Sequence, residues 1–226
     1  MINPFAFFRF TSLRFVKKVR ESTTEDGDIW TFYFQATQPL IHTAGQHGLF
    51  VLPWLKGLHI FSLASAPEED LVMIGTHVRA GSKYKQVLNS LKEGQKVGLF
   101  GPVLNFTLPR KPSAVVFLAQ GIGITPFRSM MMHVQLQNLH VPITLIHVDS
   151  REHTYQTFTK TAAGEAHFVS SADEFNAALD DVVVRIGDRA LYYTSGSPKF
   201  NKATVKRLRA LGIKGGAIKK DGFLGY

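Results

Sequence analysis

The stretch 114–126, AVVFLAQGIGITP, decides the fold class of this chain. It opens with a continuous apolar run, which is typical of a strand buried on both faces of a parallel sheet. Gly121 and Gly123 follow, and after them Thr125 can cap a helix and Pro126 suits its first turn. Such a turn brings main-chain amides close to an anion. The stretch therefore predicts a pyrophosphate-binding turn, with a turn that binds no ligand as the alternative.

A second turn of the same kind lies further along the chain. Thr194–Pro198, TSGSP, also ends an apolar strand and precedes a helix that runs through Phe200 and Leu208. Strands are expected at 114–119, 143–148, 167–170 and 190–194, each with a helical stretch nearby, the first of them at 126–139. This alternation predicts an α/β unit with a Rossmann-like parallel sheet. Because the carboxyl ends of parallel strands meet at one edge, both turns should converge on one nucleotide site.

The first half of the chain has a different pattern. Short segments rich in aromatic and β-branched residues alternate with turn signals, at 29–35, 48–52, 71–77 and 95–100. One helix is expected at 82–91, where apolar residues recur at helical spacing. The prolines of 108–112 separate the two patterns. We therefore expect an antiparallel β-barrel domain over 1–110 and an α/β domain over 111–226.

The composition excludes several classes of protein. Of the 226 residues 45% are hydrophobic and 18 are Phe, which excludes a mostly disordered chain. The chain has no Cys, which excludes disulfides and Cys-ligated iron–sulfur clusters. The nine His residues show no ligand-like spacing, so no metal site is expected. No stretch reaches the ~18 apolar residues that a membrane span needs, and we expect a soluble, cytoplasmic protein.

The net charge is strongly positive. Lys and Arg number 26 against 17 Asp and Glu, which gives +9. The long-range field therefore favours anionic partners. The basic residues are scattered along the sequence and form no run that would follow a phosphate backbone, so nucleic acid is the least favoured partner.

Further motifs occur in a fixed order along nearly the whole chain. They are Ala44–Gln46 (AGQ), His59–Pro67 (HIFSLASAP), Arg79–Tyr84 (RAGSKY), Gly101-Pro102 and the terminal Phe223–Tyr226 (FLGY). With the two turns described above, this series resembles the ferredoxin–NADP reductase superfamily, in the bacterial type that has no iron–sulfur domain. The resemblance implies an FAD-binding barrel followed by an NAD(P)-binding domain.

For the flavin, the family motif Arg-x-Tyr-Ser/Thr corresponds to His59–Ile60–Phe61–Ser62. By this resemblance Ser62 is the hydrogen-bond partner of flavin N5. His59 replaces a permanent cation with an imidazole, and Phe61 keeps an aromatic plane without the hydroxyl. The resemblance places these further residues at the FAD: Ile60, His77, Val78, Arg79, Gly81, Ser82, Lys83 and Tyr84.

For the nicotinamide nucleotide, the resemblance implies binding by both turns. The residues concerned are Gly121, Ile122, Gly123, Ile124, Thr125, Pro126, Gly196, Ser197, Pro198 and Phe200. Ser195 takes the place of the family's cysteine beside the nicotinamide. Phe223 and Tyr226 resemble the aromatic tail of the family, and Tyr226 is expected to stack on the exposed flavin face. Ser62, Ser195 and Tyr226 are thus the residues expected at the reacting atoms.

The choice between NADPH and NADH depends on the loop after the second α/β strand. Ser150 and Arg151 are of the type that accommodates the 2′-phosphate of NADPH, whereas Asp149 is of the type that binds the ribose of NADH. Asp149 can instead cap the loop. We expect NADPH to be preferred, and NADH stays open.

These residues predict an FAD-dependent NAD(P)H reductase. Electrons from NADPH would pass to a separate acceptor, an acidic carrier protein such as a ferredoxin or flavodoxin, which suits a net charge of +9. One alternative is a reductase of free flavin, quinone or ferric chelate. Another is a non-catalytic nucleotide-binding or interaction module with a degenerate flavin site, for which His59, Phe61 and Ser195 are the motivation.

Overall fold

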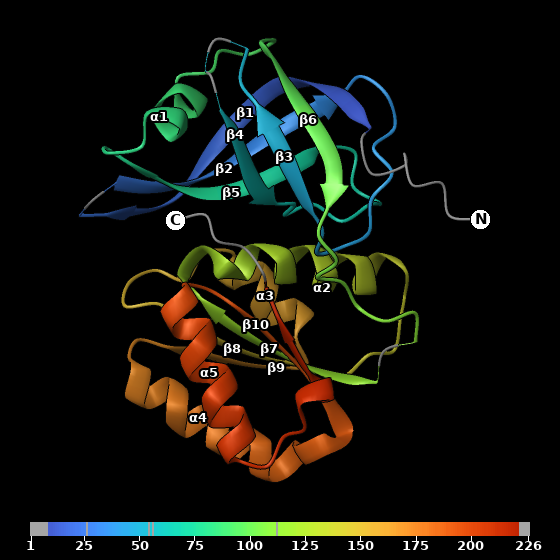
Figure 1. The fold of residues 1–226 in the computed structure, drawn as a ribbon, viewed down its shortest axis with the longest axis vertical. Coiled ribbons are helices and arrows are strands. Elements are labelled where there is room, and N and C mark those ends of the chain that lie inside the picture. Colours follow the sequence, from blue (N-terminus) through green and yellow to red (C-terminus); the bar gives the residue numbers. More distant parts are fainter. Residues whose placement is uncertain (1–8, 26, 54, 56, 112, 222–226) are drawn as a thin grey trace.

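The computed structural model describes residues 9–221 except 26, 54, 56 and 112. These residues form two domains stacked one on the other, each built on its own sheet (Figure 1). The strands of the first sheet lie within 10–103, and those of the second within 114–220. The predicted fold class, an antiparallel barrel followed by a parallel α/β sheet, is confirmed.

The first sheet is antiparallel and curls into a partly closed barrel. Its strands are β1 (Phe10–Thr24), β2 (Gly27–Ala36), β3 (His47–Val51), β4 (Leu58–Ser62), β5 (Val72–Arg79) and β6 (Lys96–Val103). They lie in the order β4-β3-β6-β1-β2-β5, and a bridge between Leu63 and Ile74 joins the two edges. Helix α1 (Lys83–Asn89) adds Tyr84 and Leu88 to a core rich in phenylalanine. Aromatic side chains at alternate strand positions therefore fill the interior.

Strand β1 is the main departure from the sequence prediction, which has no strand there. It lies between β6 and β2 in the middle of the sheet. Its register with β2 shifts between Phe15 and Lys17 and again between Arg20 and Ser22. Each bulge inserts a residue and breaks the two-residue alternation of buried and exposed side chains. The sequence of β1 consequently shows no regular strand pattern.

The second sheet is parallel and is covered by helices on both faces. Its strands are β7 (Ala114–Gln120), β8 (Ile143–Val148), β9 (Glu165–Val169), β10 (Ala190–Ser195) and β11 (Ile218–Lys220), in the order β11-β10-β7-β8-β9. Helices α2 (Thr125–Leu136) and α3 (Gln156–Ala162) pack on one face, and α4 (Ala172–Ile186) and α5 (Pro198–Ala210) on the other. The continuous apolar runs of β7 and β8 are therefore buried on both sides, as predicted.

Helix α2 lies against the barrel and joins the two domains (Figure 1). Arg128 forms a bidentate ion pair with Glu69, at 2.6 and 2.9 Å. Ser129 donates to the Ser65 carbonyl at 2.7 Å. These buried polar contacts fix how the domains meet, and hence the shape of the space between them. Within the described part of the chain, no helix has the length and apolar character needed to cross a membrane.

Candidate functional site

A cleft of ≈ 1230 Å³ lies between the two domains. Strands β4 and β5 and the turn before α1 form its barrel wall. The two glycine turns that follow β7 and β10 form the opposite wall. The cleft thus brings together motifs from both halves of the chain.

The barrel wall carries the predicted flavin motif on β4. His59 stacks on Tyr84 with ring centroids 3.8 Å apart. Burial, followed by the charge of Lys85, lowers the pKa of His59, so its imidazole is neutral at pH 7. Phe61 is only 4% exposed and packs edge-on against Phe50. Most of the Phe61 ring therefore belongs to the barrel core, and little of it is open to the cleft.

Two cations line the same wall. Arg79, at the end of β5, donates from Nε to His77 Nδ1 at 3.1 Å. Burial, and after it the charge of Arg79, lowers the pKa of Lys85. Gly81 and Ser82 lie between them in the sequence and also line the cleft, and a Cβ on Gly81 would meet nothing within 4 Å. Two crowded cations beside open backbone provide the donor chemistry that a diphosphate requires, so these residues fit the diphosphate of FAD.

The opposite wall is built from main chain. Gly121 has φ +52°, in the left-handed region that favours glycine, and an added Cβ would meet only Asp149 Oδ2, at 3.6 Å. A Cβ on Gly123 would overlap the Ser195 carbonyl and the Gly196 amide. The two glycine turns therefore touch, as the strand topology predicts. Residue 123 must be a glycine for the two turns to touch. The open side of Gly121 leaves room for a nucleotide to reach the backbone.

The start of α2 differs in one respect from the prediction. A short 3₁₀ turn, Gly121–Ile124, precedes the helix, so Thr125 is its first residue and makes no capping bond. The Thr125 hydroxyl instead donates to the Ile122 carbonyl at 2.7 Å. The extra turn shifts the helix start by one residue, which removes Thr125 from the capping position. Pro126 lies in the first turn, as predicted.

Buried side chains hold both turns in place. His147, on β8, donates from Nε2 to the Gly121 carbonyl at 2.9 Å. Burial, followed by the charge of His153, lowers the pKa of His147 to about 3, so this imidazole is neutral. In the second turn, Gln120 Oε1 accepts hydrogen bonds from the Ser197 amide at 3.2 Å and hydroxyl at 2.7 Å. The main-chain wall is thus shaped before any ligand arrives.

A polar network joins the two domains at the cleft. Ser195 donates to Asp221 Oδ2 at 2.9 Å, and Asp221 Oδ1 lies 3.2 Å from His47 Nε2. All three residues are buried. Ser62 is opposite His47 in the β3–β4 register, and Ser62, Ser195 and Asp221 all line the cleft. Ser195 is therefore hydrogen-bonded to a buried carboxylate, and the histidine beside that carboxylate is the strand partner of Ser62.

The loop after β8 lies at the edge of the cleft. Asp149 Oδ1 accepts a hydrogen bond from the Arg151 amide at 3.2 Å, so Asp149 caps the loop. Asp149 and Arg151 both line the cleft, whereas Ser150 is exposed outside it. Both an acid and a base thus remain within reach of a ribose.

Most of the predicted site residues line this cleft. They are His59, Ile60, Phe61, Ser62, His77, Arg79, Gly81, Ser82, Gly121, Ile122, Gly123, Thr125, Arg151, Ser195, Gly196 and Ser197. Four others are buried beside the lining: Val78, Tyr84, Ile124 and Pro126. Outside it, Lys83 and Pro198 are exposed, and Phe200 packs on Phe175. Phe223 and Tyr226 lie outside the described residues.

The sequence analysis missed several polar residues of the site. Gln120 and Lys85 adjoin recognised motifs, so their position in the sequence was an available signal. His47 and Asp221 belong to different domains and come together only through the fold. No local pattern points to that pair.

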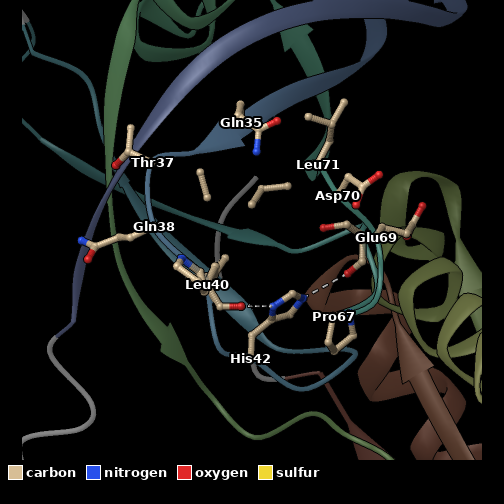
Figure 2. A pocket seen from close by; sticks show the side chains of 13 residues that line it. Gln35, Thr37, Gln38, Leu40, His42, Pro67, Glu69, Asp70 and Leu71 are labelled. Atoms are coloured by element: carbon tan, nitrogen blue, oxygen red, sulfur yellow. Dashed lines mark hydrogen bonds between the residues drawn. The ribbon is translucent and has the colours of Figure 1, made fainter.

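A second, smaller hollow of ≈ 390 Å³ lies beside the end of β2, on the barrel (Figure 2). His42 lies in it between the carbonyls of Leu40 and Ser65, at 3.4 and 3.3 Å, and burial lowers the pKa of its imidazole. Glu69, on its rim, is already paired with Arg128. None of the predicted site residues lines this hollow, and in the described part of the chain no three His, Asp or Glu side chains converge as metal ligands.

Several curated proteins similar in sequence are reductases or reductase subunits. The chain is 29% identical over 154 residues to the glycine betaine monooxygenase reductase subunit of Pseudomonas aeruginosa, covering 65% of this chain and 42% of that one. It is 36% identical over 120 residues to ferredoxin–NADP reductase B of Sorangium cellulosum, covering 50% and 45%. With a subunit of the Na⁺-translocating NADH-quinone reductase of Neisseria gonorrhoeae it shares 27% identity, covering 74% and 49%. The chain thus spans about half the length of these relatives or less.

Solved structures share the fold at low sequence identity. The ferredoxin–NADP⁺ reductase of Plasmodium falciparum matches with a TM-score of 0.76 and 13% identity, over 96% of this chain and 100% of that one. The ferredoxin reductase of carbazole 1,9a-dioxygenase matches with a TM-score of 0.80 and 15% identity, over 96% and 70%. No family model matches the sequence. The predicted resemblance is nevertheless confirmed at the level of the fold: the chain shares the two-domain fold of these ferredoxin reductases.

Proposed function

We propose that the chain is an FAD-dependent NAD(P)H oxidoreductase that passes electrons to a separate acceptor. The observation that carries this proposal is the pairing of two unlike walls across one cleft. One wall offers cationic side chains, and the other offers a glycine-rich main chain at the carboxyl ends of parallel strands. When bound, FAD and the nicotinamide nucleotide would supply the hydride chemistry.

The residues of the chain bind and orient these two cofactors. Arg79 and Lys85 neutralise the FAD diphosphate, and Ser62 orients the flavin ring. The turn from Gly121 holds the nucleotide pyrophosphate. Ser195, fixed by Asp221, occupies the position beside the nicotinamide. Because the two walls belong to domains locked together by the α2 contacts, the two cofactors would be held beside each other without a large closure.

The finer assignments follow the same geometry. NADPH is the proposed donor, since Arg151 lines the cleft as a cation near the nucleotide turn. The acceptor is proposed to be an acidic carrier protein, a ferredoxin or flavodoxin. A reductase of free flavin, quinone or ferric chelate would need no docking surface for such a protein.

One observation favours a different candidate function. Because Phe61 is almost fully buried and His59 is stacked on Tyr84 without a charge, the flavin wall is less open than the family motif implies. A nucleotide-binding module without flavin would have this property. It would bind NADPH and take up no FAD.

An absorption spectrum of the purified protein, with FAD added where needed, separates these functions. Flavin bands near ~450 nm that bleach on anaerobic addition of NADPH would establish the oxidoreductase. Absence of bands after reconstitution, together with measurable NADPH binding, would establish the module instead.

A further inference from the structure

Almost all of the net charge is carried by one segment at the end of the α/β domain. Between Pro198 and Lys220 the sequence has eight Lys and Arg and no Asp or Glu. This segment, which comprises α5 and β11, therefore contributes +8 to a net charge of +9. The rest of the chain is close to neutral, so the basic residues, although they form no continuous run, are enriched in this one segment.

Four of these cations form a stripe along α5. The residues Lys199, Lys202, Lys206 and Arg209 recur at intervals of three and four, which places them on one helix face. All four are exposed, and no described carboxylate lies within ion-pair distance of them. By contrast Arg207, on another face of the helix, forms a bidentate pair with Asp180. We call these four residues the basic stripe.

The basic stripe begins at the mouth of the cleft. Ser197 caps α5 and also lines the cleft, two residues before Lys199. From there the helix runs for about 20 Å, the length of its 13 residues at the usual rise. Lys219 and Lys220, on the neighbouring edge strand β11, add two more exposed charges beside α5. A partner bound along the stripe would therefore have one end beside the cleft, where the proposed cofactors bind.

The chemistry of the stripe identifies the class of partner. Leu208 is buried and Phe200 packs on Phe175, so α5 keeps its large apolar side chains against the domain and away from a lipid surface. Phe200 is the only aromatic residue in the segment, which leaves no ring on which a nucleic acid base could stack. Exposed lysines instead suit transient, salt-sensitive contacts with an acidic protein.

We propose that the basic stripe on α5 is the docking site of an acidic electron-carrier protein. This inference rests on the proposed reductase function, since it names where the acceptor binds. The long-range attraction would speed encounter, and the position of α5 would bring the carrier to the cleft.

The test compares two variants of the full chain with equal loss of charge. One is K199Q/K202Q/K206Q/R209Q in the stripe. The control, R14Q/K92Q/K96Q/K160Q, removes four exposed cations from other surfaces. Binding to an acidic plant-type [2Fe–2S] ferredoxin is measured by surface plasmon resonance in 20 and 200 mM NaCl. At low salt the stripe variant should bind about tenfold more weakly and lose most of the salt dependence, whereas the control should stay within about twofold of the wild type.

Other outcomes would overturn the docking site. Equal weakening in both variants would mean that net charge alone attracts the carrier. Unchanged ferredoxin binding in the stripe variant, with loss of binding to phosphatidylglycerol vesicles or to single-stranded RNA, would assign the stripe to lipid or nucleic acid. Reduction of a small dye by NADPH is assayed in parallel. Failure of the wild type in that assay would reject the reductase function and leave the binding result to be judged separately.

Discussion

The two walls of the cleft hold their ligands by different means. On the barrel wall, the groups that face the cleft are side chains, and the cations Arg79 and Lys85 dominate. On the α/β wall, the corresponding groups are main-chain amides around Gly121 and Gly123, shaped by buried neutral side chains such as His147. The barrel wall thus depends on charged side chains to hold its ligand, and the α/β wall depends on glycines whose missing Cβ exposes the main chain.

This difference explains where the chain departs from the motifs that it resembles. His59 and Phe61 replace the motif's arginine and tyrosine on the barrel wall, and Ser195 replaces a cysteine side chain. The glycines of the 121–126 turn are kept. A side chain that donates a hydrogen bond can be replaced by another donor or by a neighbouring cation, whereas main chain in close contact tolerates no added atom. The α/β wall should therefore be the more sensitive of the two to substitution.

The largest expected effect comes from Gly123→Ala. Its Cβ would overlap the Ser195 carbonyl and the Gly196 amide, which are backbone atoms and must shift. A strain of about 1–3 kcal/mol at this contact would slow flavin reduction by NADPH by about fivefold to 160-fold. Stopped-flow absorbance measures this rate, and titration with FAD should show affinity within about threefold of the wild type.

Gly216→Ala is the matched control, because a Cβ there would meet nothing within 4 Å and the site lies outside the cleft. The Gly216→Ala variant should leave the rate of flavin reduction and the affinity for FAD unchanged. If Gly123→Ala released FAD as strongly as it slowed reduction, the two walls would not act separately and the comparison would be wrong.

The next effect is on the barrel wall. Arg79→Gln and Lys85→Gln should each weaken FAD binding by about tenfold, since each removes one charge-assisted contact to the diphosphate. NADPH binding should be unaffected. Quenching of flavin fluorescence on binding gives the FAD affinity. Lys83→Gln, an exposed lysine outside the cleft lining, is the control; an equal loss there would show that FAD responds to net charge and not to these two side chains.

Periodicity and turn chemistry predicted most of the fold. The apolar runs of β7 and β8, the glycine turns and the proline at the start of α2 all lie where the sequence places them. β1 was missed because its two bulges destroy the alternation. The edge strands β4 and β11 were missed too, and they are only five and three residues long. Local pattern fails where a strand is irregular or short.

The candidate site was predictable to the extent that it consists of local motifs. Both walls were expected from the residues around His59 and Gly121. The Ser195–Asp221–His47 network was not, because it joins a barrel strand to the end of the α/β domain. The basic stripe was hidden for a related reason: its cations are separated by three and four residues and become neighbours only on a helix. The stripe lies within one helix, whereas the contact between His47 and Asp221 carries information that no short window contains.

His147 makes the α/β wall sensitive to acid. Its pKa of about 3 in the folded chain is below the ordinary value of 6.5, so below pH 6.5 the unfolded state takes up a proton that the native state does not. The native state should therefore lose about 2 kcal/mol between pH 7.5 and pH 5 through this residue alone. The His147→Gln variant keeps a donor near the Gly121 carbonyl and cannot titrate. Its free energy of unfolding should therefore fall by about 2 kcal/mol less than that of the wild type between pH 7.5 and pH 5. Urea unfolding at the two pH values measures this difference.

The exposed residue His140 provides the comparison for this measurement. His140→Gln removes an exposed imidazole outside the cleft and is measured in parallel as the control variant. A His147→Gln variant with the same pH dependence as the wild type would mean that the buried imidazole is already protonated or is free to become so in the native state.

The smallest expected effect is at the edge of the α/β wall, where we expect the side chain of Arg151 to contribute to nucleotide binding. Arg151 lines the cleft but is exposed, so water and salt screen its charge. Arg151→Ala should weaken NADPH binding by about fivefold to tenfold and NADH binding by less than about twofold, because only NADPH has a 2′-phosphate. Isothermal titration with both nucleotides measures the ratio. Equal small losses would remove Arg151 from the nucleotide site, and Asp149, which lines the cleft beside Gly121, would then favour NADH through its ribose.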